Sequence, residues 1–221
     1  MKKILFVYSF FSILFVNAQE LEAQSTVGTV TSMNDIFTKH LKNSVGEEIM
    51  GDPFLFSEWN KTGVIYADGI SYRAKEMNYN ILSDDTAILK GKDSVFIFDK
   101  VNIDSFSIGK RNFKKHYNLF YEVLSNGNNI SLLKRYEVEI IEGMFNPMDG
   151  TKEKSRFKTI DDYFIEKDNN TEKFIPSKKS ISVIFSKKAP EVKKYIKQNK
   201  LSLKKENDLI DIFNYYNQIV E

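Results

Sequence analysis

The amino-acid sequence predicts an α+β protein, an antiparallel β-meander or half-barrel of roughly eight to ten strands with C-terminal helices packed on one face or end. Between residues 63 and 176, turn signals recur about every eight to twelve residues and separate runs rich in β-branched and aromatic residues. After residue 176 the apolar residues recur at helical spacing instead. With 221 residues, of which 42% are hydrophobic and 14% aromatic, the chain can form one sizeable core.

Residues 1–18 are predicted to be a signal peptide that is removed on export. Two lysines precede an apolar run over residues 4–16, and Asn17 and Ala18 complete a site that a signal peptidase reads. The run is shorter than the roughly 20 residues that a membrane-spanning helix needs. We therefore expect the mature chain to begin at Gln19, to be exported to the periplasm or the extracellular medium, and to have no transmembrane segment after signal removal.

Four segments are expected to follow the signal peptide. Residues 19–31 are small and polar and predict a flexible leader. Residues 32–50 predict a short N-terminal helix and a linker, because apolar residues recur there at helical spacing. Residues 51–176 are predicted to form the antiparallel β domain, and residues 177–221 a helical segment packed on it.

Turn residues mark three hairpins within the β domain. The turns are predicted at residues 67–69, 125–128 and 167–170, where aspartate, asparagine and glycine tolerate the backbone angles of tight turns. Residues 143–156 are predicted to be a polar excursion between strands. The domain is therefore predicted to consist of strands that pair antiparallel with the next strand in the chain.

Three helices are predicted after the β domain. Ser177 is expected to cap the first helix, which carries Ile181 on its apolar face. Pro190 lies where the first turn of a second helix accepts proline. Apolar residues at helical spacing from Leu209 to Ile219 mark the third helix.

The composition excludes several chemistries. The chain contains no cysteine, which excludes disulfides, thiolate metal sites and cysteine nucleophiles. Its two histidines, His40 and His116, lie far apart and have no local acid or nucleophile. The local signatures of serine hydrolases, dinucleotide sites and nucleoside triphosphate sites do not occur in the sequence. We therefore expect no catalytic residue, no cofactor and no metal site.

Paired carboxylates leave a hydrolase open as an alternative. Glu137 and Glu139 alternate with apolar residues, so on a strand they share one face about 7 Å apart, which is compatible with acid–base cleavage of glycans. Asp84-Asp85 and Asp161-Asp162 are further pairs, at positions where aspartate favours turns. A half-solvated strand gives the same alternation and is the preferred interpretation. The hydrolase alternative requires these carboxylates to converge in a cleft.

One segment carries a strong local charge. Without residues 1–18 the chain has 30 basic and 30 acidic residues, yet residues 178–205 hold ten lysines and only Glu191 as an acid. Because this segment has no arginine, we expect no nucleic acid as a partner. The candidates for contact with an anionic ligand lie on the solvent side of the second predicted helix and are Lys193, Lys194, Lys197 and Lys200.

Short motifs follow one another in a specific order from residue 51 to residue 219. They are Gly51-Asp52-Pro53-Phe54-Leu55, Trp59, Gly63-Val64, Asn78-Tyr79-Asn80-Ile81, Phe120-Tyr121-Glu122-Val123-Leu124, Leu133-Lys134-Arg135-Tyr136, Asp162-Tyr163-Phe164-Ile165 and Tyr195-Ile196-Lys197-Gln198-Asn199-Lys200-Leu201. In this order and spacing the chain resembles a group of secreted β-rich proteins of Bacteroidota, mainly flavobacteria, which has no established activity. The resemblance implies an envelope location and a β-rich body followed by helices, and it transfers no functional residue. The leader and residues 143–156 depart most from the pattern.

Together these observations predict an exported cell-envelope protein that acts as a non-catalytic binding module for an apolar or anionic ligand or for a partner protein. The expected partners are a lipid, an envelope polymer or an envelope protein. A curved sheet with helices across its mouth resembles in outline a periplasmic lipoprotein carrier, which would place an apolar ligand against the concave face. The alternatives are a carboxylate-dependent glycan hydrolase and a structural adaptor that adheres to anionic envelope polymers through the lysine-rich helical face.

Overall fold

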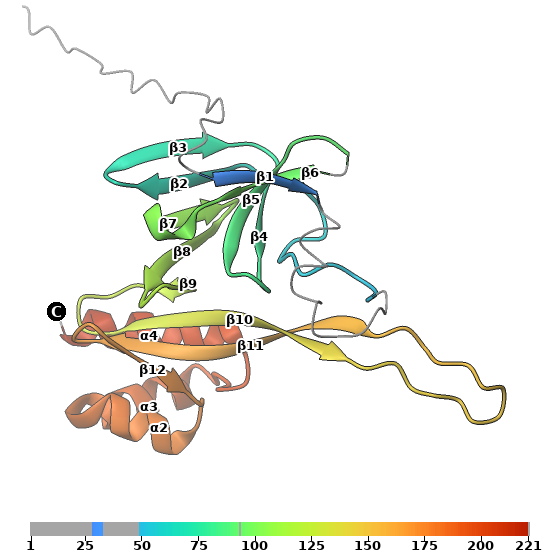
Figure 1. Ribbon diagram of the computed structural model, residues 1–221. Helices are drawn as coiled ribbons and strands as arrows, with labels where there is room; N and C mark the ends of the chain where they lie inside the picture. Colours follow the sequence, from blue (N-terminus) through green and yellow to red (C-terminus); the bar gives the residue numbers. More distant parts are fainter. Residues whose placement is uncertain (1–27, 33–48, 93, 221) are drawn as a thin grey trace, which may run out of the picture.

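The computed structural model describes residues 28–32, 49–92 and 94–220 of the chain. In this part of the chain the strands form two antiparallel sheets, one of eight strands and one of four, and three α-helices follow them (Figure 1). This architecture confirms the predicted α+β fold. Neither sheet closes on itself within the described residues, and the twelve strands described there divide between two open sheets, whereas the sequence predicted roughly eight to ten strands.

The larger sheet contains eight strands, which are β2 (Gly63–Ala67), β3 (Ile70–Ala74), β7 (Ile103–Ile108), β8 (Arg111–His116), β9 (Leu119–Ser125), β10 (Ser131–Ile141), β11 (Arg156–Lys167) and β12 (Asn170–Phe174). Their order is β12-β11-β10-β9-β8-β7-β2-β3. Neighbours in the sheet are also neighbours in the chain, except that β7 pairs with β2 across the segment that forms the smaller sheet. The predicted turns at residues 67–69, 125–128 and 167–170 join β2 to β3, β9 to β10 and β11 to β12, which confirms the three hairpins.

The smaller sheet contains β1 (Gly28–Ser32), β4 (Met77–Asn80), β5 (Asp85–Leu89) and β6 (Ser94–Phe98), in the order β1-β6-β5-β4. Strand β1 differs from the flexible leader expected over residues 19–31, because residues 28–31 belong to it. Its β-branched residues suit a strand, but its partner comes much later in the chain, where Gly28 pairs with Phe98. No local pattern in the leader signals this pairing.

Two further N-terminal predictions lie almost wholly outside the described residues. The signal peptide, residues 1–18, is one of them. The short helix and linker expected over residues 32–50 are the other, and here the structure describes only Ser32, which ends β1, and residues 49 and 50.

The first hydrophobic core lies between the two sheets. Tyr79 of β4 is 1% exposed, and the centroid of its ring lies 5.5 Å from those of Phe106 and Phe113. The two phenylalanine rings stack on each other at 4.6 Å. The sheets approach closely at Gly63, where a Cβ atom would lie 2.3 Å from the sulfur of Met77. A lipoprotein carrier would hold its ligand against the concave face of the sheet, but here side chains of the protein fill that space. The first core therefore does not support the resemblance to a carrier.

The second hydrophobic core lies between the helices and the other end of the larger sheet. The helices are α2 (Lys178–Ile184), α3 (Ala189–Gln198) and α4 (Glu206–Val220), and Figure 1 shows them on one side of β10, β11 and β12. The ring of Phe213 in α4 lies 5.5 Å from that of Phe174 in β12 and 5.3 Å from that of Phe185. This packing confirms the prediction that the terminal helices cover one end of the sheet.

The predicted start signals of the helices are confirmed. The side chain of Ser177 accepts a hydrogen bond from the backbone N–H of Ser180 at 3.0 Å, and the Ser180 hydroxyl accepts one from the N–H of Ser177 at 2.9 Å. This reciprocal pair is a capping box. Pro190 lies in the first turn of α3, where no backbone N–H is needed.

Helix α4 is attached to the turn between β9 and β10. The side-chain amide of Asn217 donates a hydrogen bond to the carbonyl of Ile130 at 2.9 Å, and this bond is buried. Gly127 lies against the same amide, because a Cβ atom at residue 127 would approach the atoms of Asn217 to 2.0–2.4 Å. The turn therefore needs glycine for a close approach to the helix.

We expect Gly127→Ala to lower the free energy of unfolding by about 1–3 kcal/mol, because the added methyl group overlaps the Asn217 side chain. In an Asn217→Ala background the overlapping atoms are gone, so the added cost of Gly127→Ala is expected to fall below about 1 kcal/mol. Urea unfolding of the four proteins measures both costs. Equal costs in the two backgrounds would contradict the close contact.

Candidate functional site

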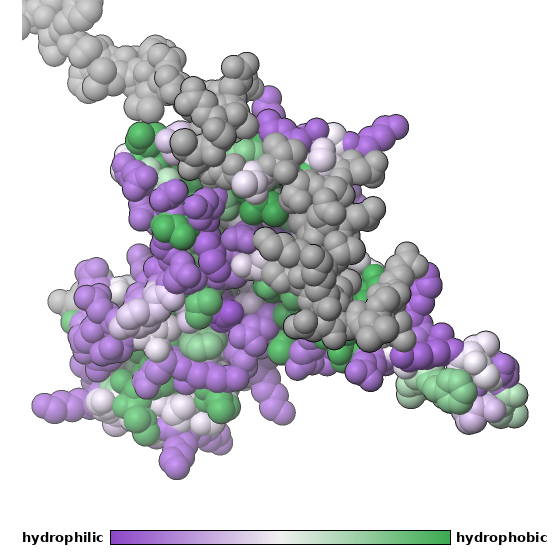
Figure 2. Space-filling model, viewed as in Figure 1, coloured by the Kyte–Doolittle hydropathy of each residue, from purple (hydrophilic) through white to green (hydrophobic). Residues whose placement is uncertain are grey.

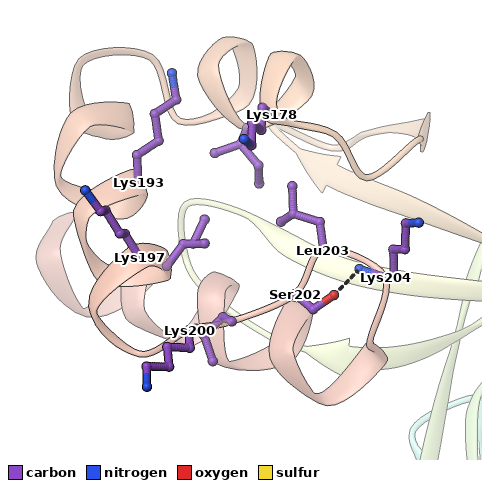
Figure 3. Close-up of a pocket in the computed structure, with 10 residues that line it drawn as sticks. Lys178, Lys193, Lys197, Lys200, Ser202, Leu203 and Lys204 are labelled. Carbon is purple, nitrogen blue, oxygen red and sulfur yellow. Dashed lines mark hydrogen bonds between the residues drawn. The ribbon is translucent and has the colours of Figure 1, made fainter.

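A pocket of about 750 Å³ lies between α2, α3 and the segment that joins α3 to α4 (Figure 3). Helix α2 contributes Lys178 and Ile181, and α3 contributes residues 193, 196 and 197. Residues 200–204 of the connecting segment complete the lining. The volume falls within the roughly 300–1,000 Å³ that is usual for small-molecule sites.

The floor of the pocket is apolar and belongs to the second core. Ile181 is 1% exposed and lies in that core, and Ile196, Leu201 and Leu203 pack against it. Figure 3 shows Leu203 pointing into the space between the helices. Because core packing holds these side chains, the floor offers a fixed apolar surface to a ligand.

Lysines form the rim of the pocket. The rim lysines are Lys178, Lys193, Lys197, Lys200 and Lys204. In Figure 3 the ammonium groups of Lys197 and Lys200 point outward, and their long flexible stems allow them to turn toward an anion. None of the five ammonium groups has an ion-pair partner among the residues that the structure describes. Within the part of the chain that the structure describes, the rim therefore carries positive charge without ion-pair partners.

The structure brings together three of the four lysines that the sequence predicts for anion contact. Lys193, Lys197 and Lys200 line the pocket, and their spacing of four and then three residues places them on one side of the helix and its end. Lys194 does not line the pocket, because it lies one position further around α3. Lys178 and Lys204 could not be predicted in this way, because they belong to other segments and share no helical period with the first three.

The end of α3 holds Lys200 in an unusual backbone conformation. The N–H of Leu201 donates to the carbonyl of Ile196 at 3.0 Å, and the N–H of Lys200 donates to that of Lys197 at 3.3 Å, which is the pattern of a Schellman cap. Lys200 has a φ of 53°, in the left-handed region that favours glycine. The chain thus carries a rim lysine at a position where glycine would be less strained.

Acidic residues near the pocket form ion pairs or hydrogen bonds with groups outside the lysine rim. Glu206 at the start of α4 lies 2.7 Å from Lys134 and accepts a hydrogen bond from the Tyr163 hydroxyl at 3.1 Å. Burial and the charge of Glu206 raise the pKa of Tyr163 to about 12. Asp208 accepts a hydrogen bond from the backbone N–H of Ser202 at 2.7 Å. These acids stabilise the attachment of α4 and do not pair with the rim lysines.

The carboxylates considered for hydrolysis lie apart from the pocket. Glu137 and Glu139 are exposed on β10, and Glu137 lies 3.1 Å from the guanidinium group of Arg135. Asp161 and Asp162 on β11 each form an ion pair with a lysine, at 3.2 and 2.7 Å. No carboxylate from residues 28–32, 49–92 or 94–220 lines the pocket. This arrangement gives no support to a two-carboxylate hydrolase.

Asp84 is the buried member of the remaining aspartate pair. It accepts a hydrogen bond from the Tyr79 hydroxyl and lies 3.8 Å from the ammonium group of Lys100. Burial raises the pKa of the Asp84 carboxyl and outweighs Tyr79 and Lys100, which lower it. The same burial and the nearby Asp84 charge hold the pKa of Tyr79 far above its usual value. Asp84 also accepts a hydrogen bond from the backbone N–H of Phe120 in β9 at 3.4 Å, so this carboxylate links the turn between β4 and β5 to the larger sheet.

The histidines and the acidic residues show no metal site in the described part of the chain. His116 packs edge-on against Tyr117, with the ring centroids 4.3 Å apart, and its Nδ1 atom lies 3.9 Å from Glu166. His40 lies outside the described residues. No cluster of three or more potential ligands occurs among the residues described.

No helix in the described part of the chain has the length and hydropathy needed to cross a membrane. Comparison with known proteins finds no protein-family model, no curated protein and no solved structure that matches the chain. The likeness to secreted proteins of Bacteroidota thus stays a prediction from the sequence.

We expect Lys200→Gly to raise the free energy of unfolding by about 0.5–1 kcal/mol, because glycine adopts the left-handed conformation without strain. Lys204→Gly is the matched control: residue 204 also lies on the rim, but its φ is not positive, so this substitution is expected to destabilise slightly. Urea unfolding measures both. A loss of stability in Lys200→Gly would contradict the strained cap.

The raised pKa of Asp84 predicts a pH dependence of stability. A carboxyl whose pKa is higher in the folded than in the unfolded state stabilises the fold below its unfolded value of 3.8, and this contribution is lost as the pH rises through the folded value. We therefore expect wild type to lose stability relative to Asp84→Asn between acid pH and pH 7. Chemical denaturation across this range measures the difference, with Asp162→Asn as a surface control. A difference that stays constant with pH would contradict the raised pKa.

Proposed function

We propose that this protein is exported and binds a small anionic amphiphile, such as a long-chain carboxylate, in the pocket between α2 and α3. The observation that carries the proposal is the combination of an apolar floor with a rim of five lysines in one cavity. An amphiphile matches both parts, because its chain covers the floor while its charged group meets the ammonium groups. The function is binding without catalysis.

Two physical effects favour this ligand class. Burial of apolar surface contributes about 25 cal/mol for each Å² removed from water, so the alkyl chain supplies most of the affinity. A concave site surrounded by charge of one sign concentrates the opposite charge, so the lysines select an anion and speed its arrival. Lysine offers single charges rather than the planar fork of arginine, so the site accepts a carboxylate or a phosphate head group.

The sequence supports the exported setting. Lysines and an apolar run precede Ala18 at the start of the chain, as in a signal peptide. The resemblance to secreted proteins of Bacteroidota points the same way. An exported binding protein would meet lipids and their breakdown products in the cell envelope.

The direct test is titration of the chain from Gln19 onward with a fluorescent long-chain carboxylate. We expect saturable binding with one site, and at least about fivefold weaker binding of the long-chain alcohol of equal length, which lacks the charge. Lys197→Glu is expected to weaken carboxylate binding about fivefold or more, because it replaces attraction by repulsion at the rim. Equal binding of the alcohol and the carboxylate would contradict a role for the lysines.

Two matched variants assign the binding to the pocket. Lys194→Glu makes the same charge change on the same helix but outside the pocket, so it is expected to change the affinity less than about twofold. Leu203→Asp places a charge on the floor and is expected to abolish binding. Native mass spectrometry of protein purified gently from its own host then identifies the bound molecule.

Lys194 also separates this proposal from the adaptor alternative. Adhesion to an anionic polymer depends on the summed charge of the helical face, so Lys194→Glu and Lys197→Glu would weaken it equally. Binding in the pocket depends on Lys197 and not on Lys194. Equal effects of the two variants, together with no saturable binding of the carboxylate, would favour the adaptor.

A further inference from the structure

The turn that joins β10 to β11 carries apolar side chains at the end of a projecting ribbon. Figure 1 shows the two strands and their turn extending beyond the rest of the molecule, and Figure 2 shows green and pale surface at the end of this projection. Met144, Phe145 and Met148 are 74%, 62% and 95% exposed. The sequence predicted only a polar excursion over residues 143–156, so this apolar tip is a finding of the structure.

The tip has a defined backbone. The N–H of Asn146 donates to the carbonyl of Thr151 at 2.8 Å, and the N–H of Gly150 donates back to the carbonyl of Asn146 at 3.0 Å. The strands approach so closely before the turn that a Cβ atom at Gly143 would lie 1.7 Å from the carbonyl oxygen of Glu153. Several backbone polar groups of the turn therefore have partners inside it, while the three apolar side chains face outward.

Asp149 is the acid next to Met148, and hydrogen bonds within the turn hold its side chain. The carboxylate of Asp149 accepts hydrogen bonds from the backbone N–H of Thr151 at 2.9 Å and from the side-chain amide of Asn146 at 2.9 Å. The bonds from Thr151 and Asn146 keep the pKa of Asp149 below its usual value. Asp149 is thus a charged group beside the apex, and it limits how deeply the tip can enter an apolar medium.

The size and charge of the tip favour a lipid surface over a protein partner. The three side chains expose roughly 400–500 Å² in total, at about 200 Å² for each residue of this size. A stable protein interface needs about 800 Å² on each partner, so the tip alone is too small for one. Residues 142–154 hold three acids and two lysines, so the tip is nearly neutral and has no attraction to a strongly charged surface.

We propose that this turn docks on a lipid bilayer by inserting Met144, Phe145 and Met148 into the interfacial layer. Insertion is feasible because several backbone groups of the turn are hydrogen-bonded within it, which lowers the cost of removing them from water. The proposal is independent of ligand binding in the pocket. The helices pack at the opposite end of β10 and β11, and eleven paired residues of these strands, about 35 Å in length, separate the two ends.

Flotation with vesicles of phosphatidylcholine tests the proposal on the chain from Gln19 onward. We expect wild type to float with the vesicles and Met148→Asp to lower the bound fraction at least about fivefold. Val101→Asp is the matched control, because Val101 is also exposed, at 68%, but lies far from the tip in the sequence. Binding is expected to change less than about twofold between 0.1 and 0.5 M salt, since it does not depend on charge.

A second measurement reports insertion directly. Trp59 is the only tryptophan, so Met148→Trp in a Trp59→Phe background places the single indole at the tip. We expect its emission to shift to the blue on addition of the same vesicles. Absence of both the shift and wild-type flotation would overturn the proposal. Equal loss of vesicle binding in Met148→Asp and Val101→Asp would also overturn it. If the protein does not bind vesicles but self-associates in a concentration-dependent way that Met148→Asp abolishes, the partner is a second copy of the chain and the proposal is wrong.

Discussion

An open antiparallel sheet of eight strands must have its apolar surface covered, and the rest of this structure follows from that constraint. Two separate elements cover this surface. The smaller sheet packs over one part, around Tyr79, and the three helices pack over the other, around Phe213. Strand β10 passes through both regions, because Leu132 lies in the helical core and Tyr136 in the core between the sheets. A strand of 11 residues is long enough to belong to both.

The features that could be predicted from the sequence are those that depend on neighbours in the chain. Ser177 caps its helix through a residue three positions away, and Asp68-Gly69 forms a turn from its own backbone preferences. The pairing of β1 with β6 depends instead on residues far apart in the chain, so the leader gave no sign of it. The division of the strands into two sheets is a non-local property of the same kind.

The residues of the candidate site also fall into those that could be predicted from neighbours in the chain and those that could not. Lys193 and Lys197 share a face of one helix and could be found from the helical period, whereas Lys178 joins them only because α2 packs beside α3. The apolar tip escaped prediction for a different reason. Met148 lies among polar residues and glycine, and only the three-dimensional course of β10 and β11 shows that it projects outward rather than folding back onto a core.

The separation of the helical core from the core between the sheets has a consequence for the dynamics of the molecule. Separate hydrophobic clusters commonly behave as separate cooperative units that open at different free energies and give amide hydrogens different exchange rates. The pocket rests on the helical core alone. A ligand bound there would stabilise the closed form of that unit by mass action and slow exchange in α2, α3 and α4, while the unit between the sheets, built around Tyr79, would keep the exchange rates of the empty protein.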